Sequence, residues 1–252
     1  MASQSYAAAA RQAGTSQNEG PSTASASHHK VENASNKPRR TSPSPSHIPQ
    51  TGAAEEEVYI LTLLTGKAHH QRMTELRRKY FPKHLNKLAA HLTLFHALPG
   101  SRLDSDIVPV IEDIARNTQP FSITAHHAFR LGRRSIAIDV PYKSGGAEAK
   151  QVRDALQEPW KQQGFLSEQD AGRTGRAFPH YTIMNKVDDE VEVQKALEEL
   201  QRDFRPDRDV ISGLGLYRYD RGFWRWVKNY DFAQAEREGG GGEKQASAGQ
   251  ES

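Results

Sequence analysis

The chain contains an internal repeat, and this repeat restricts the fold more than any other feature of the sequence. One apolar segment reads His-Leu-Thr-Leu from His91, and a second reads His-Tyr-Thr-Ile from His180. Each is preceded by a strand pattern and a helix pattern, and each is followed by a helix pattern and two strand patterns. His91 lies 38 residues before Phe129, and His180 lies 37 residues before Tyr217, at matching places in the two halves. This order predicts two similar lobes that face each other across a cleft.

Hydrophobic periodicity and turn residues predict the elements of both lobes. A turn at Gly132 and another at residues 220–222 close two hairpins, whereas the other strands are joined through helices. Such mixed connections favour an α+β fold with two largely antiparallel sheets and helices packed outside them. The expected strands are 58–64, 91–95, 121–130, 134–140, 179–184, 209–219 and 223–230, and the expected helices are 68–80, 105–117, 147–162 and 191–204.

Apolar residues are distributed unevenly, and this sets the limits of the folded part. Residues 1–54 contain only four large apolar side chains, and residues 236–252 contain none. Segments of this composition bury too little surface to offset the entropy lost on ordering, so we expect both to be disordered. Residues 55–235 then form the bilobal domain, which is long enough to bury a core without disulfides or metals.

The charge and cysteine counts exclude several classes of function. The folded part carries 27 basic and 25 acidic residues, so it lacks the strong positive field of a protein that binds duplex nucleic acid. The absence of cysteine excludes disulfides, thiolate nucleophiles and cysteine-based metal sites. No apolar stretch approaches 18 residues and no secretory signal is apparent. We therefore expect no membrane span and a cytoplasmic location, with nuclear import left open by the basic segment at 37–40.

Each motif places a histidine and a threonine on the same face of a strand. Side chains in a strand alternate between its two faces, so residues two apart point the same way, with Cα atoms about 6.6–6.8 Å apart. His91 and Thr93 therefore share one face, as do His180 and Thr182, while their apolar neighbours pack behind them. The composition predicts only about 0.17 motifs of this kind by chance, so two in matching positions indicate a function.

Two such pairs across one cleft suit the cleavage of a phosphodiester without a metal. In-line attack on phosphorus needs a base for the nucleophile and an acid on the opposite side for the leaving oxygen. Histidine, with an ordinary pKa near 6.5, performs either role at neutral pH. The threonine hydroxyls can donate hydrogen bonds to the non-bridging phosphate oxygens, where charge builds up in the transition state. The sequence does not show which histidine is the acid and which is the base.

The two motifs, their separation and the closing strands around residues 215–226 resemble those of the two-histidine (2H) phosphoesterases. This group includes 2′-5′ RNA ligase-like proteins and cyclic nucleotide phosphodiesterases. The resemblance spans about residues 56–232 and rests on the pattern His-x-Thr-hydrophobic at His91 and at His180, which are 89 residues apart. It implies a bilobal α+β fold without a metal or another cofactor.

By this resemblance, His91 and His180 would be the acid/base pair, and Thr93 and Thr182 would bind the phosphate. The substrates usual in the family are 2′,3′-cyclic phosphate ends of RNA, ADP-ribose cyclic phosphates and 2′-5′-linked oligonucleotides. We therefore expect a phosphoric diester hydrolase that acts as a monomer and whose partner is RNA or a nucleotide.

Five further residues are candidates for binding the substrate. Arg173 and Arg176 lie in a glycine-containing stretch just before the second motif, and arginine suits bidentate contact with phosphate. Phe178 offers an aromatic platform for a base. Arg130 and Arg218 occupy matching positions at the mouths of the two hairpins, where they are expected to line the cleft.

Other residues are expected to have structural roles. Trp224 and Trp226 are interpreted as core residues. Adjacent histidines at 69–70 and at 126–127 do not share a face of a helix or a strand, so they do not predict a metal site. His96 lies five residues after the first motif histidine, on the opposite face of a regular strand, and is not expected to join the site.

Three other functions are compatible with the sequence. Ester exchange is reversible, so the same site could ligate a 2′,3′-cyclic phosphate to a 5′-hydroxyl. Hydrolysis is preferred because water, at about 55 M, is hard to exclude without a closing lid. In a second alternative, the His–Thr pairs only hold phosphate in a non-catalytic RNA- or nucleotide-binding module. In a third, the chain is a scaffold whose N-terminal segment 1–54 is the working part.

Overall fold

The computed structural model describes residues 47–52 and 56–233. The segments expected to be disordered, 1–54 and 236–252, lie outside the described residues except for 47–52. These six residues contact the domain through a backbone hydrogen bond and a stacked histidine ring. The contacts made by the chain thus begin before the predicted boundary at residue 55.

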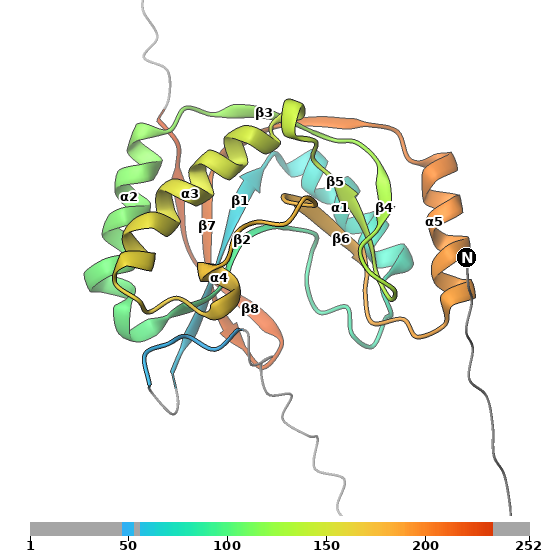
Figure 1. The fold of residues 1–252 in the computed structure, drawn as a ribbon. Helices are drawn as coiled ribbons and strands as arrows, with labels where there is room; N and C mark the ends of the chain where they lie inside the picture. Colours follow the sequence, from blue (N-terminus) through green and yellow to red (C-terminus); the bar gives the residue numbers. More distant parts are fainter. Residues whose placement is uncertain (1–46, 53–55, 234–252) are drawn as a thin grey trace, which may run out of the picture. The chain divides into compact units, whose positions relative to one another are not determined.

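The domain contains two antiparallel sheets, as the sequence predicts (Figure 1). In the larger sheet the strand order is β2-β1-β7-β3, and β8 pairs with the part of the long strand β7 that β3 leaves free. The smaller sheet has the order β4-β5-β6. The strands are β1 (Val58–Thr65), β2 (Leu92–Pro99), β3 (Phe121–Ala125), β4 (Ala128–Arg130), β5 (Ile136–Asp139), β6 (His180–Met184), β7 (Asp207–Asp220) and β8 (Phe223–Asp231).

Each lobe contains strands from both halves of the sequence. β1 and β2 from the first half are joined by β7 from the second half. β5 and β6 from the second half are joined by β4 from the first half. The internal duplication is therefore present as predicted, but neither lobe is a continuous stretch of sequence. Each half needs the other, because a missing strand would leave backbone N–H and C=O groups without partners.

The strand predicted at 121–130 is instead two strands that lie in different sheets. β3 pairs with β7, whereas β4 pairs with β5. The chain changes sheets at His126 and His127. Their backbone N–H groups donate to the carbonyl oxygen of Asp139, at 2.9 Å, and to its carboxylate, at 2.6 Å. Asp139 thus satisfies the two amides at the crossing, which would otherwise lack partners.

Helices cover both sheets, as predicted (Figure 1). α1 packs against β6 and α5 against β4 of the smaller sheet, whereas α2 packs against β7 and β8 of the larger sheet and α3 lies beside α2. The helix predicted at 105–117 begins later, at Val108, after a wider π-helical turn. The helices are α1 (Lys67–Tyr80), α2 (Val108–Asn117), α3 (Gly146–Gln162), α4 (Glu168–Ala171) and α5 (Glu190–Asp203), with short turns η2 (Gly100–Arg102), η3 (Leu103–Ile107) and η4 (Tyr142–Ser144).

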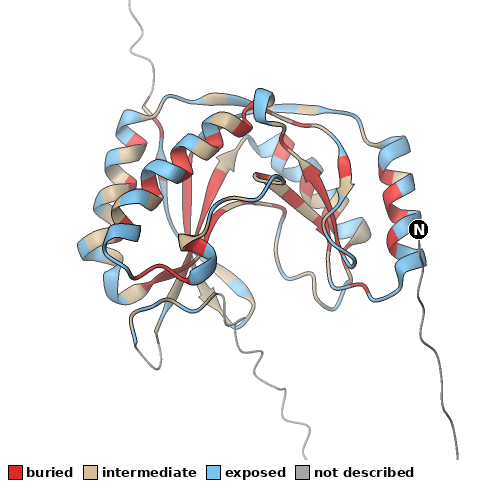
Figure 2. Ribbon diagram, viewed as in Figure 1, coloured by how far each residue is buried: buried red, intermediate tan, exposed pale blue. Residues whose placement is uncertain are grey.

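The buried residues lie where helices meet sheets (Figure 2). In the larger lobe, the ring of Phe95 on β2 meets the ring of Trp160 on α3 edge-on, with centroids 4.9 Å apart. In the smaller lobe, Tyr181 and Ile183 on β6 are both fully buried. The strands that carry the two motifs are therefore fixed from behind by the core. None of the helices in the described part of the chain is long and apolar enough to cross a membrane.

Candidate active site

The two motifs meet in one cavity between β2 and β6. His91 comes directly before β2, and His180 is the first residue of β6. Both histidines and the threonines two residues later, Thr93 and Thr182, line a cavity of about 340 Å³. Their apolar neighbours on the two strands are buried, and of these Leu94 also lines the cavity. The four polar groups are thus presented to one space by two strands from different lobes.

Each motif histidine is held by the same kind of hydrogen bond. Nδ1 of His91 lies 2.8 Å from the carbonyl oxygen of Ala89, and Nδ1 of His180 lies 2.8 Å from the carbonyl oxygen of Ala177. A carbonyl only accepts, so Nδ1 carries a proton in both rings. In the neutral form, the other ring nitrogen, Nε2, then has a free lone pair. Nε2 is thus the ring nitrogen through which either histidine can accept a proton.

The surroundings favour the neutral form of both histidines. Burial and the nearby positive charge of Arg77 lower the pKa of His91 to about 3. Burial also lowers the pKa of His180 below its ordinary value, although its hydrogen bond to Ala177 acts in the opposite direction. Among the described residues, no carboxylate lies within ion-pair distance of either motif histidine, so none offsets the effect of burial on their pKa values.

The residues expected to bind substrate divide into two groups. Arg173 and Phe178 line the cavity that contains the motifs. Arg176 is exposed in the same loop and does not line it. Arg130 lies beside α5 on another part of the surface, and Arg218 forms an ion pair of 2.8 Å with a glutamate before β1.

Strand alternation explains why these two arginines lie elsewhere. Arg130 follows Phe129 on β4, and the Phe129 ring meets the ring of His180 with centroids 6.4 Å apart. Arg218 follows Tyr217 on β7, and the Tyr217 ring lies 5.8 Å from that of Trp224. The aromatic residue of each pair contacts the ring of a residue that lines the cavity, and the arginine next to it points to the other face of the strand.

The family follows from a comparison with known proteins. The profile of the 2′-5′ RNA ligase superfamily matches residues 66–223, which is more than half of the chain and includes both His–Thr motifs. The chain belongs to the 2′-5′ RNA ligase superfamily. This confirms the resemblance to the 2H phosphoesterases that the two motifs suggest. A search of the curated proteins found no match.

Several solved structures are similar to this chain. A crystal structure of E. coli LigT complexed with 3′-AMP has 15% identity, covers 71% of this chain and 100% of LigT, and has a TM-score of 0.48. A crystal structure described as a phosphoesterase has 14% identity, with 71% and 99% of the two chains covered and a TM-score of 0.49. TT0787 of Thermus thermophilus has 14% identity, with 69% and 97% covered and a TM-score of 0.47.

In this member of the superfamily, a third histidine lines the cavity, contrary to the sequence-based expectation. Opposite β1, the register of β2 shifts by one residue between Thr93 and Phe95, which forms a β-bulge. Leu94 and Phe95 are both buried as a result, and His96 returns to the face of the motif residues. A bulge reverses the alternation of side chains, and this is why regular-strand reasoning placed His96 on the wrong face. β6 has a register shift at the equivalent place, before Met184.

Trp224 belongs to the site rather than to the core. Its ring centroid lies 4.3 Å from that of His91, and the side chain lines the cavity. Trp226 is 64% exposed, so it is not a core residue either. Both lie on β8, an edge strand that pairs only with β7 in the described part of the chain, so few elements are available to cover its side chains.

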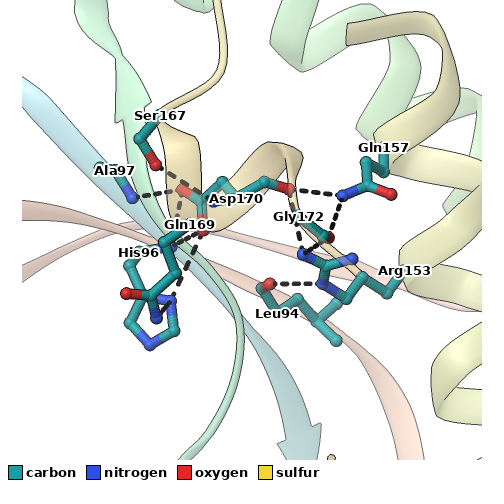
Figure 3. Close-up of polar contacts among 9 residues, drawn as sticks. All are labelled: Leu94, His96, Ala97, Arg153, Gln157, Ser167, Gln169, Asp170 and Gly172. Carbon is teal, nitrogen blue, oxygen red and sulfur yellow. Dashed lines mark hydrogen bonds and ion pairs between the residues drawn. The ribbon is translucent and has the colours of Figure 1, made fainter. Parts of the chain in front are cut away.

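Asp170 organises the loop beside the first motif (Figure 3). Its buried carboxylate accepts hydrogen bonds from the backbone N–H groups of His96, at 3.0 Å, and Ala97, at 2.8 Å. Burial alone would raise its pKa, but these bonds and the His96 ring hold the pKa below its ordinary value. The oxygen Oγ of Ser167 accepts from the backbone N–H of Asp170, 3.2 Å away, and caps α4. The Ser-x-x-Asp spacing is a helix-start signal that the sequence analysis did not use.

A buried arginine supports each motif strand from the helix of the other half. Arg77 on α1 donates from Nη1 to the carbonyl oxygen of Thr182, at 2.7 Å. Arg153 on α3 donates from Nε to the carbonyl oxygen of Leu94, at 3.2 Å (Figure 3). Burial lowers the pKa of Arg77 to about 10, so its guanidinium is still charged at neutral pH. Since α1 precedes β2 but supports β6, and α3 does the reverse, the two arginines tie the motif strands of the two lobes together.

Proposed function

We propose that this protein is a metal-independent phosphodiesterase that hydrolyses RNA or nucleotide termini, either 2′,3′-cyclic phosphates or 2′-5′ linkages. The observation that carries the proposal is the presence of two His–Thr pairs in one cavity, each histidine with Nδ1 held by a carbonyl and Nε2 free. Such a site supplies two proton-transfer groups and two hydroxyl donors around one phosphate. Its partner is then RNA or a nucleotide, bound by the cavity between the lobes.

We assign the base of the hydrolytic step to His91 and the acid to His180. Burial and the charge of Arg77 favour the neutral form of His91 most strongly. Neutral His91 takes a proton from water as the water oxygen bonds to phosphorus. The bond from phosphorus to one ribose oxygen breaks, and protonated His180 donates its proton to that oxygen. Thr93 and Thr182 donate hydrogen bonds to the non-bridging oxygens, and solvent then restores both histidines.

The lowered pKa values predict an acid-shifted pH profile. The step needs His91 neutral and His180 protonated, and in the free protein the pKa of His180 lies below 6.5. The value of kcat/KM should therefore fall with rising pH, with a midpoint below 6.5, because it reports the free protein. A bound phosphate raises the pKa of His180, so the same limb of the kcat profile should lie at higher pH. Initial rates from pH 4 to 9 test this, and a midpoint of kcat/KM above 6.5 would contradict the assignment.

The test of the proposed function compares three reactions of the purified full-length chain. These are the opening of a 2′,3′-cyclic phosphate on a short RNA, the cleavage of a 2′-5′-linked dinucleotide, and the joining of a cyclic phosphate end to a 5′-hydroxyl end. We expect hydrolysis of the first or second substrate, followed by chromatography of the products. Joining without hydrolysis would identify a ligase. Tight binding without any turnover would identify a non-catalytic module.

A further inference from the structure

A second cavity adjoins the active-site cavity and shares two of its lining residues. It has a volume of about 410 Å³, within the range of roughly 300–1,000 Å³ typical of small-ligand sites. His91 and Trp224 line both cavities. A ligand whose phosphate contacts His91 therefore lies next to the entrance of this second space. None of the residues predicted to bind substrate from the sequence lines it.

The second cavity combines cationic and aromatic side chains. Lys67 at the start of α1 and Lys87 in the loop before β2 line it, and no aspartate or glutamate of the described residues does so. Neither lysine forms an ion pair with any residue of the described part of the chain. Tyr217 and Trp224 line the same space, with ring centroids 5.8 Å apart. An anion with a flat ring attached to it fits this combination.

Lys87 is held in place without its charge being neutralised. Its Nζ lies 5.0 Å from the centroid of the Phe223 ring, in a cation–π arrangement at the β7–β8 turn. A carboxylate partner would cancel the positive charge, whereas an aromatic face leaves it available to a ligand. Lys67 is likewise exposed at the rim. Grooves that bind single-stranded nucleic acid pair cationic side chains for the backbone with aromatic rings for the bases.

We propose that the second cavity binds the nucleotide that precedes the terminal one in a single-stranded RNA. The base of that nucleotide stacks on Tyr217 and Trp224, and its phosphate lies against Lys67 and Lys87. The terminal nucleoside and its cyclic phosphate occupy the cavity between the motifs. The inference rests on the proposed function and narrows its substrate, because an oligoribonucleotide fills both cavities and a mononucleotide fills one.

The test compares the double variant Lys67→Ala/Lys87→Ala with the matched control Lys143→Ala/Lys161→Ala. Both variants lose two positive charges from exposed lysines, but Lys143 and Lys161 line neither cavity. The substrates are a five-nucleotide RNA with a 2′,3′-cyclic phosphate and the corresponding mononucleoside 2′,3′-cyclic phosphate. We expect the first variant to lower kcat/KM at least about tenfold for the RNA and less than twofold for the mononucleoside. The control should change neither.

Salt dependence gives an independent readout. Each neutralised phosphate of a single strand contributes about 0.7 to the slope of log affinity against log salt. Lys67 and Lys87 share one phosphate, so its loss in the double variant should reduce the slope by about 0.7. An equal loss for the RNA and the mononucleoside, or an RNA rate equal to that of the control, would overturn the inference.

Failure of the proposed function would be recognised separately, as the absence of turnover by the wild type of both substrates and of a 2′-5′-linked dinucleotide. The second cavity is then tested by fluorescence anisotropy with a labelled five-nucleotide RNA that ends in a 3′-phosphate. A loss of affinity of about tenfold in Lys67→Ala/Lys87→Ala, but not in the control, would support the cavity as an RNA site. Equal affinities of the two variants would overturn it.

Discussion

Replacing His180 with alanine should lower the turnover of an RNA 2′,3′-cyclic phosphate by about 10²–10⁴-fold, the usual contribution of one general acid or base. His91→Ala should have an effect of the same size. Both side chains are partly exposed in the cavity, so neither substitution removes core packing. Circular dichroism should show an unchanged fold. Turnover of either variant within threefold of the wild type would contradict the catalytic roles.

The two substitutions should differ on a substrate with a good leaving group. A 4-nitrophenyl phosphodiester releases an oxygen that needs no proton, so an acid becomes dispensable whereas a base does not. His180→Ala should therefore lose far less activity on this substrate than on the cyclic phosphate, and His91→Ala should lose about the same on both. The opposite pattern would make His180 the base and His91 the acid. The double variant should be only slightly less active than the less active of the two single variants, because the effects of substituting residues that act as a unit do not add.

Replacing Asp170 with alanine should lower the free energy of unfolding by about 3 kcal/mol. The carboxylate is 1% exposed and accepts from the backbone N–H groups of His96 and Ala97. Its loss leaves two amides without an acceptor, and each unpaired buried group costs about 1–3 kcal/mol. The same loop carries Arg173 to the cavity, so activity should also fall.

Urea unfolding measures this effect, with two companion variants. Asp188→Ala is the matched control, because Asp188 is 83% exposed and its ion pair with Arg134 should contribute at most about 1 kcal/mol. Asp170→Asn keeps one acceptor oxygen and should lose less stability than Asp170→Ala. A loss below about 1 kcal/mol for Asp170→Ala would show that the loop is not held by this carboxylate.

The motif residues could be predicted because a short strand obeys a local rule. Alternation alone puts His91 with Thr93 and His180 with Thr182, and the structure places all four at one cavity. The same rule failed for His96, because the bulge in β2 depends on its register against β1, a separate strand earlier in the sequence. Long-range pairing of this kind is not written in the local pattern.

The presence of strands from both halves in each lobe could not be predicted from the sequence pattern, for a related reason. The apolar run at 121–130 has the period of one strand, but its two parts pair with β7 and with β5. What separates them is Asp139, a residue on another strand that accepts from the amides of His126 and His127. Arg130 and Arg218 were expected at matching places in the repeat, and the strand registers contradict this. Leu61 and Ile136 stand at equivalent places opposite the two motif strands, and they pair with Leu216 and with Arg130.

The measurement that tests the central claim most directly is the hydrolysis of a short RNA bearing a 2′,3′-cyclic phosphate in the presence of EDTA. The His91→Ala/His180→Ala double variant gives the background, and chromatography locates the phosphate in the product. Because two histidines supply both proton transfers, turnover by the wild type should be the same with and without EDTA and should exceed the background by at least about 100-fold. Turnover that EDTA abolishes, or turnover by the double variant as fast as that of the wild type, would contradict a two-histidine mechanism for this site.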